Sequence, residues 1–307
     1  MTLPTASLDS QSATALAALK EGVEAVTTSD GWQRWLEVQA AFPRYSPRNS
    51  LLIAMQCPAA SLVCSARQWN QLGRRVNAGE RSLRILAPLH RTMEVASVTS
   101  TADQSSDPEA RKLLVGFRPV PVFDVSQTNG QPLPASPVHQ LDGDEVPSGL
   151  RAALDSATSQ NAIEVRRGSA SELGIPSSAN GAAWMESGRR VIGLRSGLSL
   201  AQEAKTMAHE VGHHLLGHLD TERRLDGTTR ADLEVEAESF AFLVCRSHGL
   251  ATDDYSFGYV AAWAGGDSKK VFEVAHRVTT AARPLCHDAQ AVLRRDRDSE
   301  AEQCVGR

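Results

Sequence analysis

Aromatic residues and long apolar runs are both scarce in this chain of 307 residues. Phe, Trp and Tyr together make up 5% of it, and no stretch of about eighteen apolar residues occurs, so the sequence predicts no membrane span. Residues 1–20 lack a basic start followed by an apolar block, which argues against a secretory signal. Hydrophobic content of 41% still suffices for packed cores, and the length indicates one large or two modest domains.

Paired cysteine motifs are also missing. The chain has an odd number of cysteines and no Cys-x-x-Cys pair, so we expect free thiols in a reducing compartment and place the protein in the cytoplasm. A structural zinc site built on cysteine is disfavoured for the same reason. The five cysteines are Cys57, Cys64, Cys245, Cys286 and Cys304.

The net charge of −4 hides an uneven distribution of charge along the chain. Residues 32–91 contain nine arginines and two acids, a formal charge of +7, so the remainder is strongly acidic. A basic part joined to an acidic part predicts that the basic part contacts a polyanion. The alternative interpretation is an ordinary basic surface.

The most informative motif is His-Glu-Val-Gly-His at residues 209–213. Two imidazoles four residues apart leave the same face of a helix, where one zinc ion can bind both. The glutamate between them is then placed as a general base. A helix is expected here because Ser199 and Gln202 have the spacing of a capping box and Gly217 is a plausible stop.

A zinc site with one open position needs a third protein ligand. The candidates are three glutamates, Glu234, Glu236 and Glu238, on a second predicted helix at residues 232–248. Glu234 and Glu238 share a face, whereas Glu236 points about 200° away from Glu234 at helical pitch. The choice therefore lies between the first pair and Glu236.

These two helices resemble those of the gluzincin metallopeptidases, and the Glu-x-Glu-Ala-Glu-x-Phe-Ala pattern at residues 234–241 is similar to the ImmA/IrrE group. The resemblance implies that His209, His213 and Glu234 bind Zn²⁺, with Glu210 catalytic. It also implies that Glu238 orients a ligand histidine, with Glu236 as the fallback ligand. The neighbouring His214 and His218 are not expected to bind the metal. His214 is adjacent to a ligand and should point elsewhere, and His218 is expected at the helix end, where a cation suits the dipole.

The order of predicted elements indicates an α+β fold with two domains. Residues 1–128 read as helices followed by short strands, with a flexible insertion at 97–112. Residues 129–147, rich in proline and glycine, read as a linker. Residues 148–307 read as a helix, a strand, a hairpin turning at 187–188 and then the His-Glu-Val-Gly-His helix, which is the order of a zincin-like peptidase domain.

Other elements are predicted from caps, periodicity and turn residues. In the first domain we expect helices at 11–28, from a cap at Asp30 to just before Pro43, from a cap at Ser46 with Pro47 in the first turn, and at 66–72. Strands are expected at 61–64, 74–76, 82–87 and 116–125. In the second domain we expect helices at 148–161, 268–282 and 284–296, and strands at 163–167, 182–185 and 190–194. One of the strands near the motif is a candidate edge for binding an extended peptide.

The N-terminal part resembles the N-terminal domain of ArdC-type antirestriction proteins. The resemblance is carried by an ordered series of segments at residues 45–53, 62–63, 69–76, 79–81, 85–88 and 123–128. It implies a domain that binds single-stranded DNA, joined to a C-terminal metallopeptidase.

Arginines that neutralise phosphates and aromatic rings that stack on unpaired bases are the side chains such binding needs. The candidates are Arg44, Tyr45, Arg48, Arg67, Trp69, Arg74 and Arg75. Core packing of Trp69 and a capping contact by Tyr45 are the alternative interpretations.

The sequence therefore predicts a mobile-element-type antirestriction protein that binds single-stranded DNA and cleaves an unidentified protein with a zinc peptidase site. One alternative is a non-proteolytic protein that protects DNA and uses zinc structurally. Another is an ImmA-like regulatory protease that acts on a DNA-bound repressor. Candidates for stabilising the oxyanion are Tyr255, Tyr259, His248 and His276.

Overall fold

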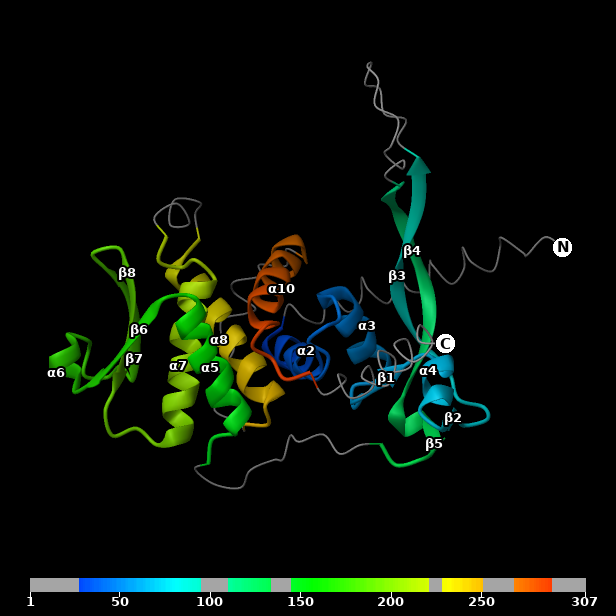
Figure 1. Cartoon of the computed structure of the whole chain (residues 1–307), viewed down its shortest axis with the longest axis horizontal. Coiled ribbons are helices and arrows are strands. Elements are labelled where there is room, and N and C mark those ends of the chain that lie inside the picture. The colour runs from blue at the N-terminus through cyan, green and yellow to red at the C-terminus, as the bar shows by residue number, and fades with distance from the viewer. Residues whose placement is uncertain (1–27, 95–109, 134–144, 221–227, 251–267, 289–307) are drawn as a thin grey trace, which may run out of the picture.

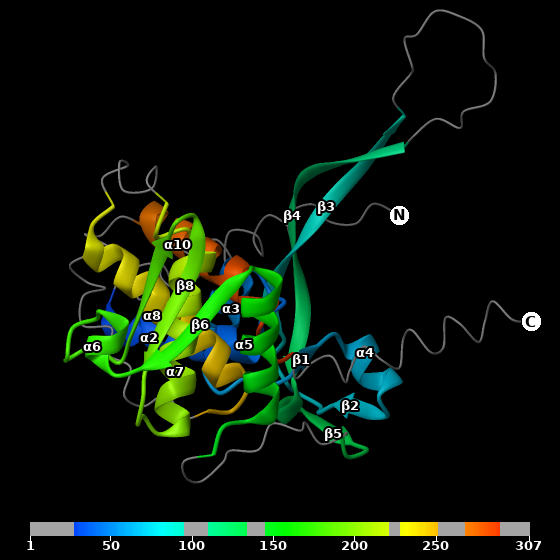
Figure 2. The same cartoon turned by 60° about the vertical axis from the view of Figure 1, so that its left-hand side comes forward.

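The structure is a computed structural model that describes residues 28–94, 110–133, 145–220, 228–250 and 268–288. It mixes helices and strands, which confirms the α+β prediction. A body of helices and sheets carries a long two-stranded ribbon that projects away from it (Figures 1 and 2). The predicted helix at 11–28 lies almost wholly outside the described residues.

Two helices open the described chain. Helix α2 (Ser29–Ala41) begins at Thr28, whose hydroxyl accepts a hydrogen bond from Gly31 N at 3.1 Å. The prediction that Asp30 caps this helix is therefore wrong, since the hydroxyl of Thr28 occupies the capping position. Helix α3 (Pro47–Gln56) begins at Ser46 with proline in its first turn, as predicted.

The strands that follow form two small antiparallel groups. A three-stranded sheet has the order β1-β4-β3, formed by β1 (Val63–Cys64), β4 (Ala110–Asp124) and β3 (Leu83–Glu94). A second pair joins β2 (Arg74–Val76) to β5 (Thr128–Gly130). Helix α4 (Ala66–Gln71) lies between β1 and β2, and the 3-10 turn η1 (Val125–Gln127) between β4 and β5.

Strands β3 and β4 are longer than predicted. They pair from Leu83 with Val122 out to Glu94 with Ala110, with one irregularity at Leu89. The expected flexible insertion at 97–112 therefore loses residues 110–112 to β4, and its remainder lies outside the described residues. Because the sequence beyond residue 87 lacks the alternation of a half-buried strand, the projecting part of the ribbon could not be predicted.

The second sheet precedes the motif helix and matches the prediction. Its order is β6-β8-β7, with β8 (Arg189–Arg195) in the centre, parallel to β6 (Ile163–Gly168) and antiparallel to β7 (Gly181–Glu186). The hairpin turns at Ser187 and Gly188, both with positive φ. Strand β7 is thus at an edge of this sheet, with its outer side not paired to a described strand.

In the described part of the second half the helices are α5 (Ser148–Gln160), α6 (Ala170–Leu173), α7 (Leu200–Leu215), α8 (Arg230–Ser247) and α10 (Ser268–Ala282). Ser199 caps α7 by accepting from Gln202 N, as expected. The predicted helix at 284–296 is not seen in its described part, where residues 283–285 form a turn, 286 a bend, and 287–288 are irregular.

Helices α7 and α8 approach each other closely. A Cβ atom added at Gly212 would lie 3.0 Å from the ring of Phe240, closer than ordinary contact allows. The glycine in the middle of the motif therefore lets the two helices touch, and this contact sets the distance between their functional side chains.

Helix α2 shares its core with the second half of the chain. Trp32, Trp35 and Leu36 belong to the same buried apolar cluster as Phe240 and Val244 of α8. The indole N–H of Trp32 also donates to Ser239 Oγ at 2.9 Å. The division into domains at 1–128 and 148–307 with a linker at 129–147 stays a prediction. In the structure, α2 from the first of these parts packs on α8 from the second.

Two simpler expectations can also be compared with the structure. No helix in the described part of the chain combines the length and apolar character needed to cross a bilayer. The four described cysteines are thiols and not disulfide-bonded, with Cys64 and Cys245 buried, and Cys304 lies outside the described residues.

Candidate metal centre

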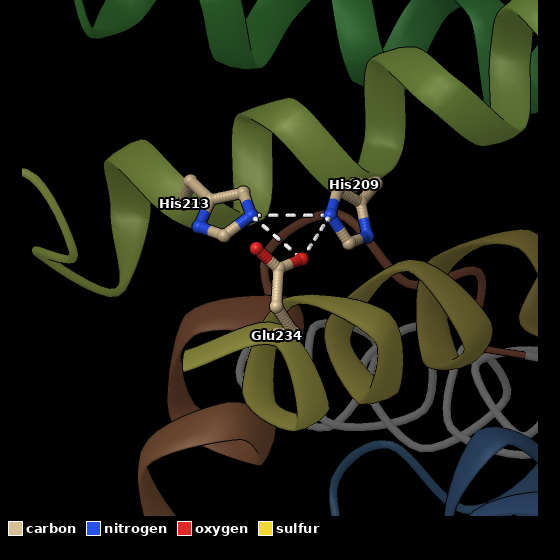
Figure 3. Close-up of side chains that lie close together, drawn as sticks. All are labelled: His209, His213 and Glu234. Atoms are coloured by element: carbon tan, nitrogen blue, oxygen red, sulfur yellow. Dashed lines mark hydrogen bonds and ion pairs between the residues drawn. The ribbon is translucent and has the colours of Figure 1, made fainter. Parts of the chain in front are cut away.

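Helices α7 and α8 bring three potential metal ligands together (Figure 3). The Nε2 atoms of His209 and His213 lie 3.1 Å apart. A carboxylate oxygen of Glu234 lies 3.3 Å from the first and 3.6 Å from the second. Among the described residues this is the group whose donor atoms could jointly hold one metal ion.

The chemistry of this donor set fits a divalent metal. Two imidazole nitrogens and one carboxylate oxygen are the ligands of catalytic zinc sites that keep one position open. Burial opposes protonation of His209, but hydrogen bonds to Glu234 and Glu238 raise its pKa to about 10. The site thus stabilises positive charge where the donors converge, and a metal must displace the proton on His209 to bind.

The carboxylate of Glu234 is matched to this environment. Its hydrogen bonds to His209 and His213 hold its pKa well below the usual range, so it stays ionised. Arg230, one turn earlier on α8, lies 3.7 Å from its other oxygen. An ionised carboxylate beside two imidazoles is ready to serve as a ligand.

His209 is oriented by the second predicted acid. Its Nδ1 lies 3.0 Å from a carboxylate oxygen of Glu238, one turn beyond Glu234 on α8. When Nδ1 carries the proton and donates to this oxygen, Nε2 is left with a lone pair for the metal. The geometry agrees with the orienting role that the resemblance implies for Glu238.

His213 is backed by a buried relay that the sequence did not reveal. Its Nδ1 lies 2.9 Å from Nδ1 of His218, whose Nε2 lies 3.2 Å from a carboxylate oxygen of Glu236. The other oxygen of Glu236 accepts from Arg277 of α10. If each histidine donates toward Glu236, the protons are all accounted for and Nε2 of His213 remains free for a metal.

This relay corrects the expectation for Glu236 and shows the surroundings of His218. Glu236 is fully buried and both of its oxygens are used by His218 and Arg277, so it is not a ligand as the fallback supposed. His218 lies just beyond the end of α7, as expected, and it is 1% exposed with both ring nitrogens hydrogen-bonded. The sequence held one signal of this buried role: Glu236 lies on the face of α8 opposite Glu234, where its neighbours are apolar.

The relay predicts a measurable effect on metal affinity. His218→Phe should keep the packing but leave His213 without its acceptor, and we expect metal binding to weaken by about 10–100-fold. Competition with a chromophoric chelator would measure the Kd. His248→Phe is the matched control, since His248 is also buried but bonds to the carbonyl of Leu285, away from the site. Equal affinities of the two variants would contradict the positioning role.

Glu210 sits between two hollows beside the ligands. It is 7% exposed, and burial raises its pKa although the nearby histidines oppose this. One hollow of about 680 Å³ is bounded by residues 181–183 of β7 and by α7 and α8; the other, of about 260 Å³, lies toward Gln202 and Thr206. A Cβ at Gly181 would lie 2.6 Å from Thr206 Cγ2 and 3.3 Å from Glu210 Cγ, so the glycine lets β7 approach α7 closely beside the acid.

The remaining histidines near the motif have structural partners. His214 is buried, and its Nε2 lies 3.0 Å from the carbonyl of Val191 in β8, so it faces the sheet as expected. His248 and His276, two candidates for oxyanion stabilisation, do not line either hollow around Glu210. The other two candidates, Tyr255 and Tyr259, lie outside the described residues.

Three of the candidate DNA-binding residues make contacts within the protein. Trp69 is wholly buried and donates to the carbonyl of Phe123 at 2.9 Å, so the prediction that it stacks on bases is wrong. Tyr45 is half-buried, lies edge-on to Phe42 and reaches the carbonyl of Val63. The guanidinium of Arg74 is occupied by three hydrogen bonds to Thr128 and Gln131.

Four of the predicted arginines remain at the surface. Arg48, Arg67 and Arg75 are exposed, and Arg44 is 60% exposed with Asp288 3.3 Å away. In the sequence they lie between the end of α2 and strand β2. Their role in binding nucleic acid stays a prediction.

Comparison with known proteins identifies the two parts of the chain. Residues 12–123 match the N-terminal domain of anti-restriction factor ArdC, and residues 170–249 match the IrrE N-terminal-like domain. The chain thus combines a segment that matches the ArdC N-terminal domain with a segment that matches the IrrE N-terminal-like domain. The resemblance stated from the sequence is thereby confirmed, and helix α2, which packs on α8, lies within the ArdC match.

The individual proteins compared with this chain share 25% sequence identity with it or less. An uncharacterized protein of Bacillus anthracis is 25% identical over 292 residues, which cover 86% of this chain but 49% of the relative, so the chain spans about half of that protein's length. The metal-free structure of the antirestriction protein ArdC from plasmid R388 has a TM-score of 0.48 and 21% identity, covering 83% of this chain and 86% of that one. Its Mn(II)-bound structure has a TM-score of 0.48 and 19% identity, covering 91% and 97%.

Proposed function

We propose that this ArdC-type chain hydrolyses peptide bonds of a specific protein and binds single-stranded DNA in the cytoplasm of a bacterial host. The observation that carries the peptidase part is the convergence of His209, His213 and Glu234 beside a buried Glu210. The bound metal would be a divalent cation, for which we propose zinc because of the mixed nitrogen and oxygen ligands.

Each residue of the site has its own role in the proposed reaction. A divalent ion held by the three ligands would polarise the scissile carbonyl and make water more acidic. Glu210 takes the proton from the attacking water and delivers it to the leaving amine, and its raised pKa suits a base that must also act as an acid. Glu238 and the His218–Glu236 pair keep the ligand imidazoles oriented.

The substrate would enter as an extended peptide along β7. This strand is at the edge of its sheet and lines the larger hollow. An edge strand offers backbone N–H and C=O groups that pair with an added strand, while pockets on either side select side chains. The two hollows on either side of Glu210 would receive the residues flanking the scissile bond.

The DNA-binding part rests on the ArdC-type match and on the basic segment at residues 32–91. Single-stranded DNA should bind more tightly than duplex, with an affinity that falls as salt rises. Removing one phosphate contact should reduce the slope of log K against log salt by about 0.7. Fluorescence anisotropy of Arg67→Ala and Arg75→Ala against wild type would measure these slopes.

Arg151→Ala provides the control for this titration, since Arg151 is an exposed arginine on α5, outside the basic segment. Its slope should equal that of the wild type. Binding that does not respond to salt, or slopes equal in all four proteins, would speak against an arginine surface that contacts phosphates.

A further inference from the structure

A third hollow lies away from the metal ligands, where α3, β4 and α10 meet. Its volume is about 280 Å³, and none of the metal ligands lines it. Residues 46–49 at the start of α3 form one wall, Phe117 of β4 a second, and Phe272 and His276 of α10 a third. The site therefore joins the ArdC-type part of the chain to its C-terminal helix.

Two aromatic rings face this hollow from opposite elements. Phe117 is 54% exposed, which is unusual for a phenylalanine in a chain with so few aromatic residues. Phe272 packs with its inner side on the main core, and the guanidinium of Arg48 lies over its ring at 5.6 Å. Exposed rings next to an arginine are the surface on which unpaired bases stack.

The polar groups around the hollow favour an anionic ligand with a planar apolar part. Arg48 is exposed, and the first turn of α3 contains no acid, so the positive end of the helix is not neutralised locally. The amide of Asn49 makes two hydrogen bonds with the backbone of Leu86, which fix it in place and leave one N–H and one lone pair unused.

We propose that this hollow binds one unpaired nucleobase of single-stranded DNA, with the adjoining phosphate beside Arg48. The inference rests on the DNA binding proposed above and names where one base is held. The volume of about 280 Å³ lies just below the usual range for ligand pockets, about 300–1,000 Å³, which suits a single base rather than a strand. The ring of Phe117 stacks on the base, and Asn49 and His276 meet its polar edge.

The test uses the full chain and two labelled single-stranded oligonucleotides of equal length, one normal and one with abasic positions throughout its central part. Phe117→Ala should raise the Kd for the normal oligonucleotide by about 5–150-fold and leave the Kd for the abasic one unchanged. The salt slope should match the wild type, because no phosphate contact is lost.

Two further variants guard against indirect effects. Val115→Ala removes an equally exposed apolar side chain from the same strand outside the hollow and should bind both oligonucleotides like the wild type. Phe272→Leu keeps an apolar side chain against the core but loses the ring, and it should weaken binding of the normal oligonucleotide selectively.

The outcomes separate the two proposals. A wild type that binds single-stranded DNA with a salt slope, together with a Phe117→Ala variant of unchanged affinity, overturns the nucleobase site and leaves DNA binding standing. An equal loss on both oligonucleotides also overturns it, because the lost contact would then not be to a base. A wild type that binds neither oligonucleotide overturns both proposals.

Discussion

His213→Ala should abolish tight binding of a divalent metal ion by the purified full-length chain. The substitution removes one of three converging donors and also leaves the Nδ1 of His218 without its partner. Losing an orienting partner alone costs about 10–100-fold in affinity, so the loss of a ligand should exceed this. Competition titrations of Zn²⁺ and Mn²⁺ against a chromophoric chelator would measure it.

The neighbouring residue offers the matched control. His214→Ala removes a buried imidazole that bonds to Val191 of β8 and faces away from the ligands. This variant should unfold at a lower temperature and still bind metal with near wild-type affinity. If His213→Ala binds as tightly as His214→Ala, the three residues are not the metal site.

Glu210→Gln should retain the metal and lose hydrolysis by about 10²–10⁴-fold. The amide keeps the size of the side chain but cannot accept a proton from water, while all three ligands remain. Comparing protein N-termini in cells that express the wild type or the variant would find cleavage sites that depend on Glu210. The kcat/KM on a peptide of the sequence found there would then give the magnitude.

Glu203→Gln is a suitable control because Glu203 lies on the same helix and pairs with Arg167 at the surface. It should cleave like the wild type. The Glu210→Gln chain also separates the functional alternatives: protection of incoming DNA by this variant would show that hydrolysis is not needed for the biological role. Cleavage at the wild-type rate by Glu210→Gln would remove the general base from the mechanism.

The parts of the site that follow from helical periodicity could be predicted from the sequence. His209 and His213 are four residues apart on α7, and Glu234 and Glu238 are four apart on α8, so each pair shares a face. Once the two helices pack through Gly212 and Phe240, these faces meet. The helix caps Ser46 and Ser199 could be predicted for the same reason, because each lies directly before the helix that it caps.

The parts that depend on long-range packing could not be predicted. The partners of Glu236 are His218, just beyond α7, and Arg277 on α10, and no local pattern links them. Trp69 is of a residue type that stacks on bases. Its indole N–H instead donates to the carbonyl of Phe123, more than fifty positions later, and this contact holds the ring in the core. The side chain that does face outward, Phe117, lies on a strand whose sequence gave no reason to separate it from core residues.

The packing of α2 on α8 has a consequence for synthesis of the chain. Trp32 and the serine to which it donates are 207 positions apart. At ribosomal rates of about 5–20 residues per second, roughly 10–40 s pass between the emergence of the two. During that interval the tryptophan face of α2 lacks the helix that covers it, so the nascent chain must expose it to water or hand it to a chaperone until the C-terminal half arrives.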